Sequence, residues 1–283
     1  MIPERRALSP KNVMLDLLRM TRHKPISTKS LIETGTLFGF NSNAVRVALT
    51  RLVSQGMVES DERGLYRLSL STNPMNQLIE DWRKGDARRI NWSDQSWLVC
   101  HLSKCPNRSE RNHSIKALSF QGFKEGLDNL WVRPNNLALP FDELLERLTF
   151  LGLENNAALF STRDIDGAIA ERWRHQLWNP VNLKRAYRES LAKLKKSEKK
   201  LLKMPTREAM IESFYLGGEA IHILVKDPLL PDEIFLCTDR QHLCETMLHY
   251  DTVGRSIWAK EVSDLPPAEQ FAENNNHNIR RIK

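Results

Sequence analysis

The chain has 283 residues, of which 41% are hydrophobic and 27% charged, a balance typical of a globular protein rather than a disordered one. Lysine and arginine (42) outnumber aspartate and glutamate (35), and the resulting net charge of +7 is compatible with nucleic-acid binding. No apolar run is long enough to cross a bilayer and none resembles a signal peptide, so we expect a cytoplasmic protein with no membrane partner. Four cysteines in so long a chain do not indicate a disulfide scaffold.

Residues 1–72 are predicted to contain three short helices followed by a hairpin. The first helix is expected to begin at Ser9-Pro10, because a serine side chain caps a helix and proline suits the first helical position. The second is expected to begin after Ser27 or Thr28, which are also good caps. Short helices joined by tight turns are typical of a helix-turn-helix.

The third helix is predicted over residues 42–55, and Gly56 follows it at the position where a left-handed residue commonly ends a helix. Residues 57–60 and 65–70 then have the pattern of two strands joined by a turn. A hairpin after the third helix makes the expected unit a winged helix-turn-helix.

One face of the third helix is apolar and the other is polar, cationic and free of acids. The expected apolar stripe comprises Val45, Ala48, Leu49, Leu52 and Val53. We expect the DNA contacts to come from Ser42, Asn43, Arg46, Val47, Thr50 and Arg51 on the helix and from Arg63 and Arg67 in the hairpin. Arginine can bind guanine and asparagine adenine through paired hydrogen bonds, so Asn43 and Arg46 are the expected base readers, with Thr50 and Arg51 nearer to phosphate.

Charge is concentrated in this part of the chain, since residues 1–72 carry eleven basic and six acidic side chains. The tip of the hairpin is only weakly basic, because Asp61 and Glu62 oppose Arg63. Double-stranded operator DNA is therefore the expected partner. The alternative is a helical protein-interaction domain that never touches DNA.

Residues 73–95 are interpreted as a connecting helix and linker. Their basic cluster of Arg83, Lys84, Arg88 and Arg89 is interpreted as a solvated helix face or as a flank for DNA. Residues 96–164 alternate between strand-like and helix-like runs, which predicts a small α+β domain. The expected strands are 97–102, 130–132 and 157–161, and the expected helices are 108–121 and 141–151.

Residues 165–265 are predicted to form a helical C-terminal domain, and residues 266–283 a disordered tail. The lysine-rich run from Lys193 to Lys203 is interpreted as a solvated helix surface, as a flank for DNA or as a patch for the phosphates of coenzyme A.

The sequence contains only weak candidates for a catalytic or metal site. The two groups that could suggest zinc are Cys100, His101, Cys105 and His113, and Cys237, His242, Cys244 and His249. Neither group has the paired spacing of a zinc site, so buried structural cysteines are the simpler interpretation. We expect no catalytic residue, no metal and no cofactor.

Three passages resemble the PaaX family, the phenylacetic-acid degradation repressors. The first runs from Leu31-Ile32 through Ala44-Val45-Arg46-Val47-Ala48-Leu49-Thr50-Arg51-Leu52-Val53 to Tyr66-Arg67-Leu68. The second runs from Gly122-Phe123 to Leu130-Trp131-Val132-Arg133-Pro134-Asn135-Asn136-Leu137, and the third is Asp227-Pro228-Leu229-Leu230-Pro231. After Pro231 the chain departs from the family's pattern.

The resemblance implies a mixed α and α+β architecture, in which a winged helix-turn-helix precedes a central ferredoxin-like domain and a helical C-terminal domain. It also implies a homodimer that represses catabolic genes and is released by an aryl-acyl-CoA. The alternative is a degenerate metal-dependent nuclease or a CoA-ester enzyme with an accessory DNA-binding domain. The strand at 97–102 offers Cys100 and His101 but no acid that could hold a metal for nuclease chemistry.

Overall fold

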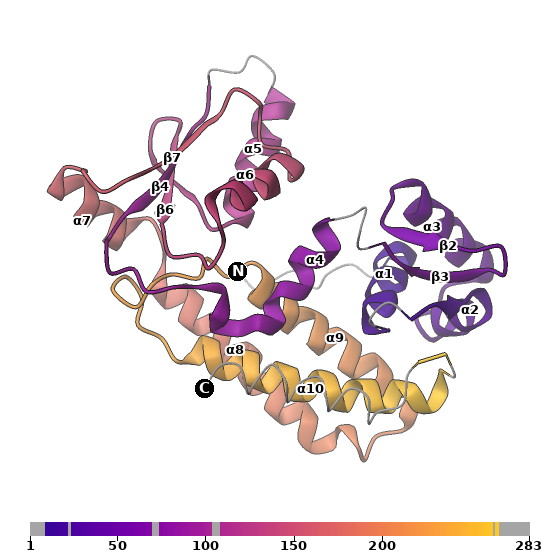
Figure 1. Ribbon diagram of the computed structural model, residues 1–283. Coiled ribbons are helices and arrows are strands. Elements are labelled where there is room, and N and C mark those ends of the chain that lie inside the picture. The colour runs from indigo at the N-terminus through magenta and orange to yellow at the C-terminus, as the bar shows by residue number, and fades with distance from the viewer. Residues whose placement is uncertain (1–8, 22–23, 70–73, 104–107, 263, 266–283) are drawn as a thin grey trace. The chain divides into compact units, whose positions relative to one another are not determined.

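The computed structural model of the chain describes residues 9–21, 24–69, 74–103, 108–262 and 264–265 (Figure 1). The chain divides into two compact units, one from residues 1–83, 190–221 and 244–283 and the other from residues 84–189 and 222–243. Helices and two small antiparallel sheets make up the described parts of these units. Among the described helices, none has both the length and the apolarity that a membrane span requires.

The first unit begins with three helices and a small sheet. The elements follow the order α1 (Pro10–Met20), β1 (Ile26–Ser27), α2 (Thr28–Leu37), α3 (Ser42–Ser54), β2 (Val58–Ser60) and β3 (Leu65–Leu68). The sheet has the strand order β1-β3-β2, and both pairings are antiparallel. The three predicted helices and the hairpin are present, whereas the short strand β1 was not predicted.

Each of the three helices begins at a residue whose side chain caps it. The side-chain oxygens of Ser9, Ser27 and Asn41 accept a hydrogen bond from the amide three residues further on, at 3.2, 3.2 and 2.8 Å. Such caps satisfy amides that have no partner within the helix. Gly56 follows α3 with a φ of 63°, the left-handed conformation expected there.

The core of this part lies between α1 and α3. The buried residues of α1 include Val13, Met14, Leu17 and Leu18, and those of α3 are Val45, Ala48, Leu49 and Leu52. Val53, which we placed in the apolar stripe, is instead 36% exposed. At 3.6 residues per turn it lies about 40° beyond Leu49 around the helix axis, outside the buried arc.

The rest of the first unit is helical. It contains α4 (Pro74–Glu80), the start of the 3-10 segment η1 (Asp81–Arg88), and parts of α8 (Pro180–Leu201), α9 (Thr206–Val225) and α10 (Asp239–Glu261). Gly85 interrupts η1 with a φ of 52° and a ψ of −130°, so the segment after α4 is not one continuous helix.

The second unit contains the larger sheet. Its elements follow the order β4 (Trp97–His101), α5 (Arg108–Phe120), β5 (Lys124–Leu127), β6 (Leu130–Pro134), α6 (Phe141–Phe150), β7 (Ala158–Thr162) and α7 (Gly167–Gln176). The strand order is β5-β6-β4-β7 and every pairing is antiparallel, with Val99 opposite both Val132 and Phe160. The expected strands and helices of this region are present, and β5 is an additional edge strand.

The two faces of the larger sheet bury different side chains. Helices α5 and α6 lie together on one face (Figure 1), where they cover residues such as Leu98, Cys100 and Trp131. Trp97 lies opposite, and its ring is 5.3 Å from that of Trp173 on α7. Successive residues of β4 therefore point to opposite faces of the sheet, as expected for a strand.

Candidate nucleic-acid interface

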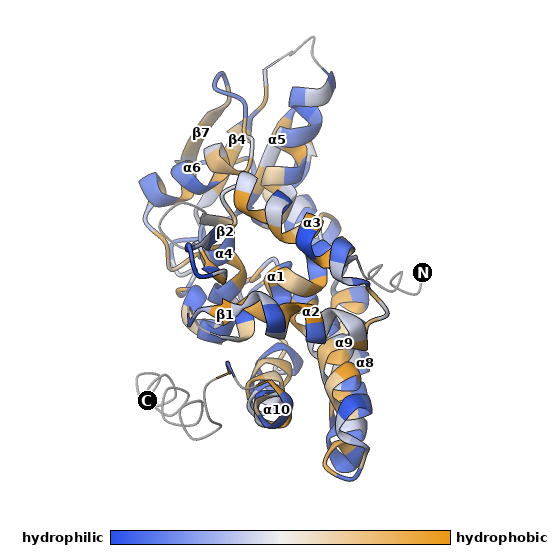
Figure 2. Ribbon diagram, turned by 90° about the vertical axis from the view of Figure 1, so that its right-hand side faces the viewer, coloured by the Kyte–Doolittle hydropathy of each residue, from blue (hydrophilic) through white to orange (hydrophobic). Residues whose placement is uncertain are grey.

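The sequence-predicted DNA contacts lie on α3 and on the β2–β3 hairpin, both within the first unit. Ser42, Asn43, Arg46, Val47, Thr50 and Arg51 are all exposed on α3, and Arg63 and Arg67 are exposed on the hairpin. Figure 2 shows hydrophilic and hydrophobic residues alternating along α3, as expected for a helix with one buried face. The six helix residues thus form one outward surface, which we call the α3 face.

The α3 face carries positive charge that no described neighbour neutralises. Neither Arg46 nor Arg51 makes an ion pair or a side-chain hydrogen bond with another residue that the structure describes. Thr50 donates its hydroxyl proton to the carbonyl of Arg46 at 3.0 Å, which leaves its oxygen free to accept a hydrogen bond. Two unpaired guanidiniums on an exposed helix are suited to an anionic partner.

Helices α2 and α3 cross very closely. A Cβ atom on Gly35 of α2 would lie 2.5 Å from Cγ2 of Val45 on α3, so only glycine fits at this point. The connection between the helices is residues 38–41, and Gly39 has a φ of 78°. A glycine in the left-handed conformation allows the chain to turn sharply within this four-residue connection.

The hairpin neutralises one of its two candidate arginines. The guanidinium of Arg67 donates to Glu59 across the β2–β3 pair, with Nε 2.9 Å from Oε2. The hydroxyl of Ser69 donates to the other oxygen at 3.0 Å. The hydrogen bond from Arg67 is the main reason that the pKa of Glu59 lies below its usual value. Arg67 is therefore less available to a phosphate than the arginines of α3.

Asp61 organises the tip of the hairpin. Its Oδ1 accepts hydrogen bonds from the amides of Arg63 and Leu65, both at 3.0 Å. The carbonyl of Gly64 accepts from the hydroxyl of Thr28, at the start of α2, at 2.8 Å. An aspartate in this role shapes a turn through its local hydrogen bonds. The side chain of Arg63 remains exposed beside it.

The structure adds two cations that sequence reasoning missed. Lys11, in the first turn of α1, donates from Nζ to Oε1 of Gln55 at 2.6 Å, next to the C-terminal end of α3. Lys29, in the first turn of α2, has a side chain that is 84% exposed. No sequence pattern pointed to Lys11, because 44 residues separate it from Gln55.

The basic cluster at residues 83–89 is not the solvated face that the sequence suggested. Arg83 bonds Asp251 and Glu80, both at 2.8 Å, in the first unit. In the second unit, Arg88 donates to the carbonyl of Leu224, and Arg89 bonds Asp86 at 2.9 Å and Asp232 at 2.7 Å. These three arginines are used in internal contacts, so neither a solvated helix face nor a DNA flank describes them.

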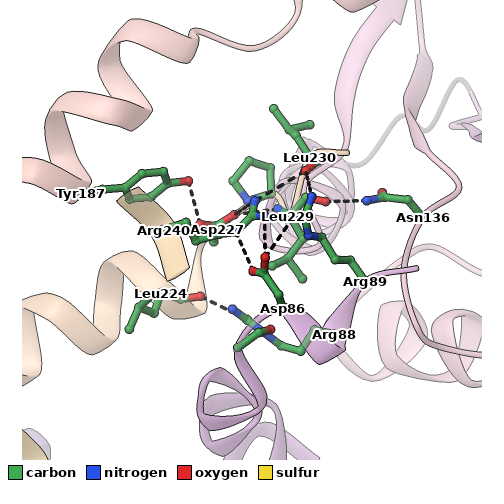
Figure 3. Close-up of polar contacts among 12 residues, drawn as sticks. Asp86, Arg88, Arg89, Asn136, Tyr187, Leu224, Asp227, Leu229, Leu230 and Arg240 are labelled. Atoms are coloured by element: carbon green, nitrogen blue, oxygen red, sulfur yellow. Dashed lines mark hydrogen bonds and ion pairs between the residues drawn. The ribbon is translucent and has the colours of Figure 1, made fainter. Parts of the chain in front are cut away.

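The second unit contains a polar cluster around Asp227, the first residue of the third family-like passage (Figure 3). Tyr187 donates its hydroxyl proton to Asp227 at 2.7 Å, and Arg240 lies 3.8 Å from the same carboxylate. Arg240 also bonds Asp86 at 3.0 Å, and Asp86 bonds Arg89 at 2.9 Å. Burial and the charge of Asp227 raise the pKa of Tyr187, so its hydroxyl stays protonated as a donor.

The backbone after Asp227 is fixed by two buried side chains. Asn136 donates to the carbonyl of Leu229 at 2.7 Å, and Arg133 donates to the carbonyl of Pro228 at 3.3 Å. Leu229 has a φ of 53°, which is unusual for a residue other than glycine. Its amide donates to Asp227 at 2.7 Å. The second and third family-like passages thus meet in a structural contact.

The cysteines have the environment of structural residues. Cys100, Cys237 and Cys244 are free and buried, and burial raises the pKa of the Cys100 thiol to about 12. Cys105 lies outside the described residues. Within the described residues, no group of three or more histidine, cysteine, aspartate or glutamate side chains is placed to hold a metal ion.

A polar hollow of about 380 Å³ lies in the second unit, between the end of β7 and the segment before β4. Its lining includes Asp94, Ser96, Asn135, Arg163 and Asp164. Sites for small organic ligands are mostly apolar, with a few polar groups that fix orientation. The hollow therefore does not fit the aryl end of an aryl-acyl-CoA.

Comparison with known proteins agrees with the first of the three family-like passages. Curated protein sequences contain no match to this chain. The uncharacterized protein Rv0674 from Mycobacterium tuberculosis has a similar structure, with a TM-score of 0.61 and 21% identity over 89% of this chain and 97% of that one. At this identity the likeness shows the fold alone. The family model described as PaaX-like protein matches residues 13–71, which hold nearly all of α1 through β3, and this match confirms the resemblance to the PaaX family.

Proposed function

We propose that the chain is a DNA-binding transcriptional regulator. The match of residues 13–71 to the PaaX-like family indicates a regulator, and the observation that carries DNA binding is the exposed, unpaired cationic face of α3. The order of three helices and three short strands supports a winged helix-turn-helix, with α3 as its recognition helix. We assign the chain no catalytic role.

In this proposal α3 enters the major groove, which is wide enough to admit a helix. The N-terminal residues of a recognition helix reach the base edges, so Asn43 and Arg46 read bases and Val47 contacts the methyl group of thymine. Thr50 and Arg51 lie further along the helix and contact phosphate. The hairpin contributes little, since Arg67 is already bonded to Glu59.

The other parts of the proposal concern the second unit and regulation. The strand order β5-β6-β4-β7, with α5 and α6 on one face, supports a ferredoxin-like domain. We further propose, on the resemblance to the PaaX family, that the protein is a cytoplasmic homodimeric repressor. An aryl-acyl-CoA would release it by binding better to a form that cannot bind DNA.

A binding titration tests the proposal. Fluorescent duplexes that tile the region upstream of the protein's own gene are titrated with the full chain, beside an unrelated duplex of equal length. We expect at least one duplex to bind with a Kd on the order of 10⁻⁸ M and at least about 10³-fold more tightly than the unrelated one. Equal affinity for every duplex across a salt series would overturn the proposal.

The effector and the dimer have separate tests. Phenylacetyl-CoA added to the complex should lower the observed affinity, whereas free coenzyme A, the control, should not. No response to phenylacetyl-CoA or to other aryl-acyl-CoA thioesters would remove the effector from the proposal and leave DNA binding intact. Sedimentation of the free protein as a monomer at micromolar concentration would remove the dimer.

A further inference from the structure

We propose that α8 carries a second DNA-contact surface, which binds the phosphate backbone without reading sequence. This inference rests on the proposed function, because it assumes that DNA is the partner. The C-terminal part of α8 and the turn after it contain six lysines, at positions 193, 195, 196, 199, 200 and 203. These six lysines differ sharply in what they contact.

Two of the lysines are neutralised by the neighbouring helix α9. Nζ of Lys193 lies 3.0 Å from Glu219, and Nζ of Lys200 lies 3.0 Å from Glu212. Glu198, the one acid in this stretch of α8, lies 2.7 Å from His249 on α10. These three acids are therefore already paired, and none of them neutralises the other four lysines.

The remaining four lysines form what we call the lysine stripe: Lys195, Lys196, Lys199 and Lys203. All four are exposed, and none makes an ion pair or a hydrogen bond from its side chain with a residue that the structure describes. At 3.6 residues per turn, the three that lie within α8 fall inside an arc of about 100°. Lys203 follows in the turn after the helix. Four unpaired ammonium groups on one side repel one another, and a polyanion relieves that repulsion.

The length of the lysine stripe fits a nucleic-acid strand. Its last member lies eight positions after its first, which corresponds to about 12 Å along a helix axis. One DNA strand rises about 3.4 Å per phosphate along the duplex axis and also winds around it, so the number of contacts depends on the reach of the flexible lysine side chains, which allows roughly three or four phosphates. The structure thus offers a row of charges long enough to contact several phosphates.

Other anionic partners fit this surface less well. A helix that lies on a lipid surface needs a free apolar face, whereas Leu194 and Leu201 of α8 are 1% and 0% exposed and Leu202, just after the helix, is a single exposed leucine. Coenzyme A needs a concave site for its adenine, whereas the stripe lies on the convex side of a helix. The phosphate backbone of DNA can bind this surface without a pocket or an apolar face.

The test replaces all four lysines of the stripe by alanine in the full chain. The control variant is Lys193→Ala/Lys200→Ala, which removes the two ion-paired lysines of the same segment. Binding of an unrelated duplex is measured between 50 and 200 mM salt, a range in which phosphate contacts weaken strongly. We expect the slope of log K against log salt to become shallower by about 3 units, at about 0.9 per phosphate contact, with little change in the control.

The use of an unrelated duplex separates this inference from the proposed function. Failure of the wild type to prefer its own upstream DNA refutes the proposed function, while a slope that depends on the stripe still supports the second surface. A slope unchanged in the four-alanine variant overturns the inference, even if sequence preference is intact. Loss of binding to phosphatidylglycerol vesicles or to coenzyme A, with an unchanged slope, also overturns it in favour of that ligand. Thermal unfolding confirms that the variant is folded.

Discussion

The buried carboxylate of Asp251 offers a sharp test of how α10 is held in the first unit. One of its oxygens, Oδ2, lies 2.8 Å from both Nη1 of Arg83 and Nε of Arg255, and the three side chains are 10%, 12% and 3% exposed. Arg255 also donates to the carbonyl of Met20, at the end of α1. The carboxylate therefore joins η1, α10 and α1 through two guanidiniums.

Replacing Asp251 with asparagine keeps the shape of the side chain and removes its charge. Loss of one partner from a buried ion pair typically costs about 3–5 kcal/mol, because the other charge remains buried. Arg83 keeps its 2.8 Å bond to Glu80, whereas the 2.8 Å contact between Arg255 and residue 251 loses its negative charge. We therefore expect Asp251→Asn to lower the free energy of unfolding by about 3 kcal/mol, the low end of that range.

Urea unfolding followed by circular dichroism measures this cost. With an m-value of about 3 kcal/mol/M, a loss of about 3 kcal/mol lowers the midpoint by roughly 1 M urea. The matched control is Glu33→Gln, because Glu33 is 63% exposed and its contact with Lys29 is 3.9 Å long, so it should shift the midpoint little. A midpoint of Asp251→Asn within 0.2 M of wild type, on the order of the control, would refute the reasoning.

Three further outcomes are expected. Burial opposes ionisation of Asp251, but the adjacent guanidiniums outweigh burial and hold the pKa of this carboxyl below its usual value. The difference in unfolding free energy between wild type and Asp251→Asn should therefore be full at pH 7 and shrink as pH falls below about 4. A difference that grows in acid would contradict this. Gly35→Ala should cost about 1–3 kcal/mol by thermal unfolding, because a Cβ at position 35 would lie 2.5 Å from Val45. The same substitution should cost less in a Val45→Ala background. Equal costs in the two backgrounds would count against the close crossing. Gly126→Ala should displace Trp173, whose Nε1 would lie 2.6 Å from the new Cβ, and so change tryptophan fluorescence; an unchanged emission spectrum would contradict the contact.

Sequence patterns within a few residues predicted the helices and those strands whose residues are mostly apolar. Capping residues such as Ser9 and Ser27 mark helix starts through contacts within a few residues, which a sequence displays directly. The strand β5 was missed because Lys124–Leu127 lies at the sheet edge, where its residues are mostly exposed and lack the alternation of apolar side chains that marks a half-buried strand.

Contacts between distant residues could not be predicted in this way. The cluster of positive residues at 83–89 read as an exposed face, yet Arg83 pairs with Asp251, 168 residues away. A charge pattern alone does not tell a solvated arginine from one that is buried beside an acid from another part of the chain. For the α3 face, the sequence placed Arg46 on the polar side of the helix but could not show whether an acid neutralises it. The structure adds that Arg46 has no partner among the described residues.

Arg46 is the residue that tests most directly whether the α3 face reads DNA sequence. The direct measurement is the ratio of affinities for the preferred upstream duplex and an unrelated duplex, determined for wild type, Arg46→Ala and the exposed control Arg207→Ala on α9. We expect Arg46→Ala to lower this ratio by about fivefold to 150-fold, equivalent to about 1–3 kcal/mol, and Arg207→Ala to leave it unchanged. A folded Arg46→Ala protein that keeps the full wild-type ratio would show that the α3 face does not read the sequence through Arg46.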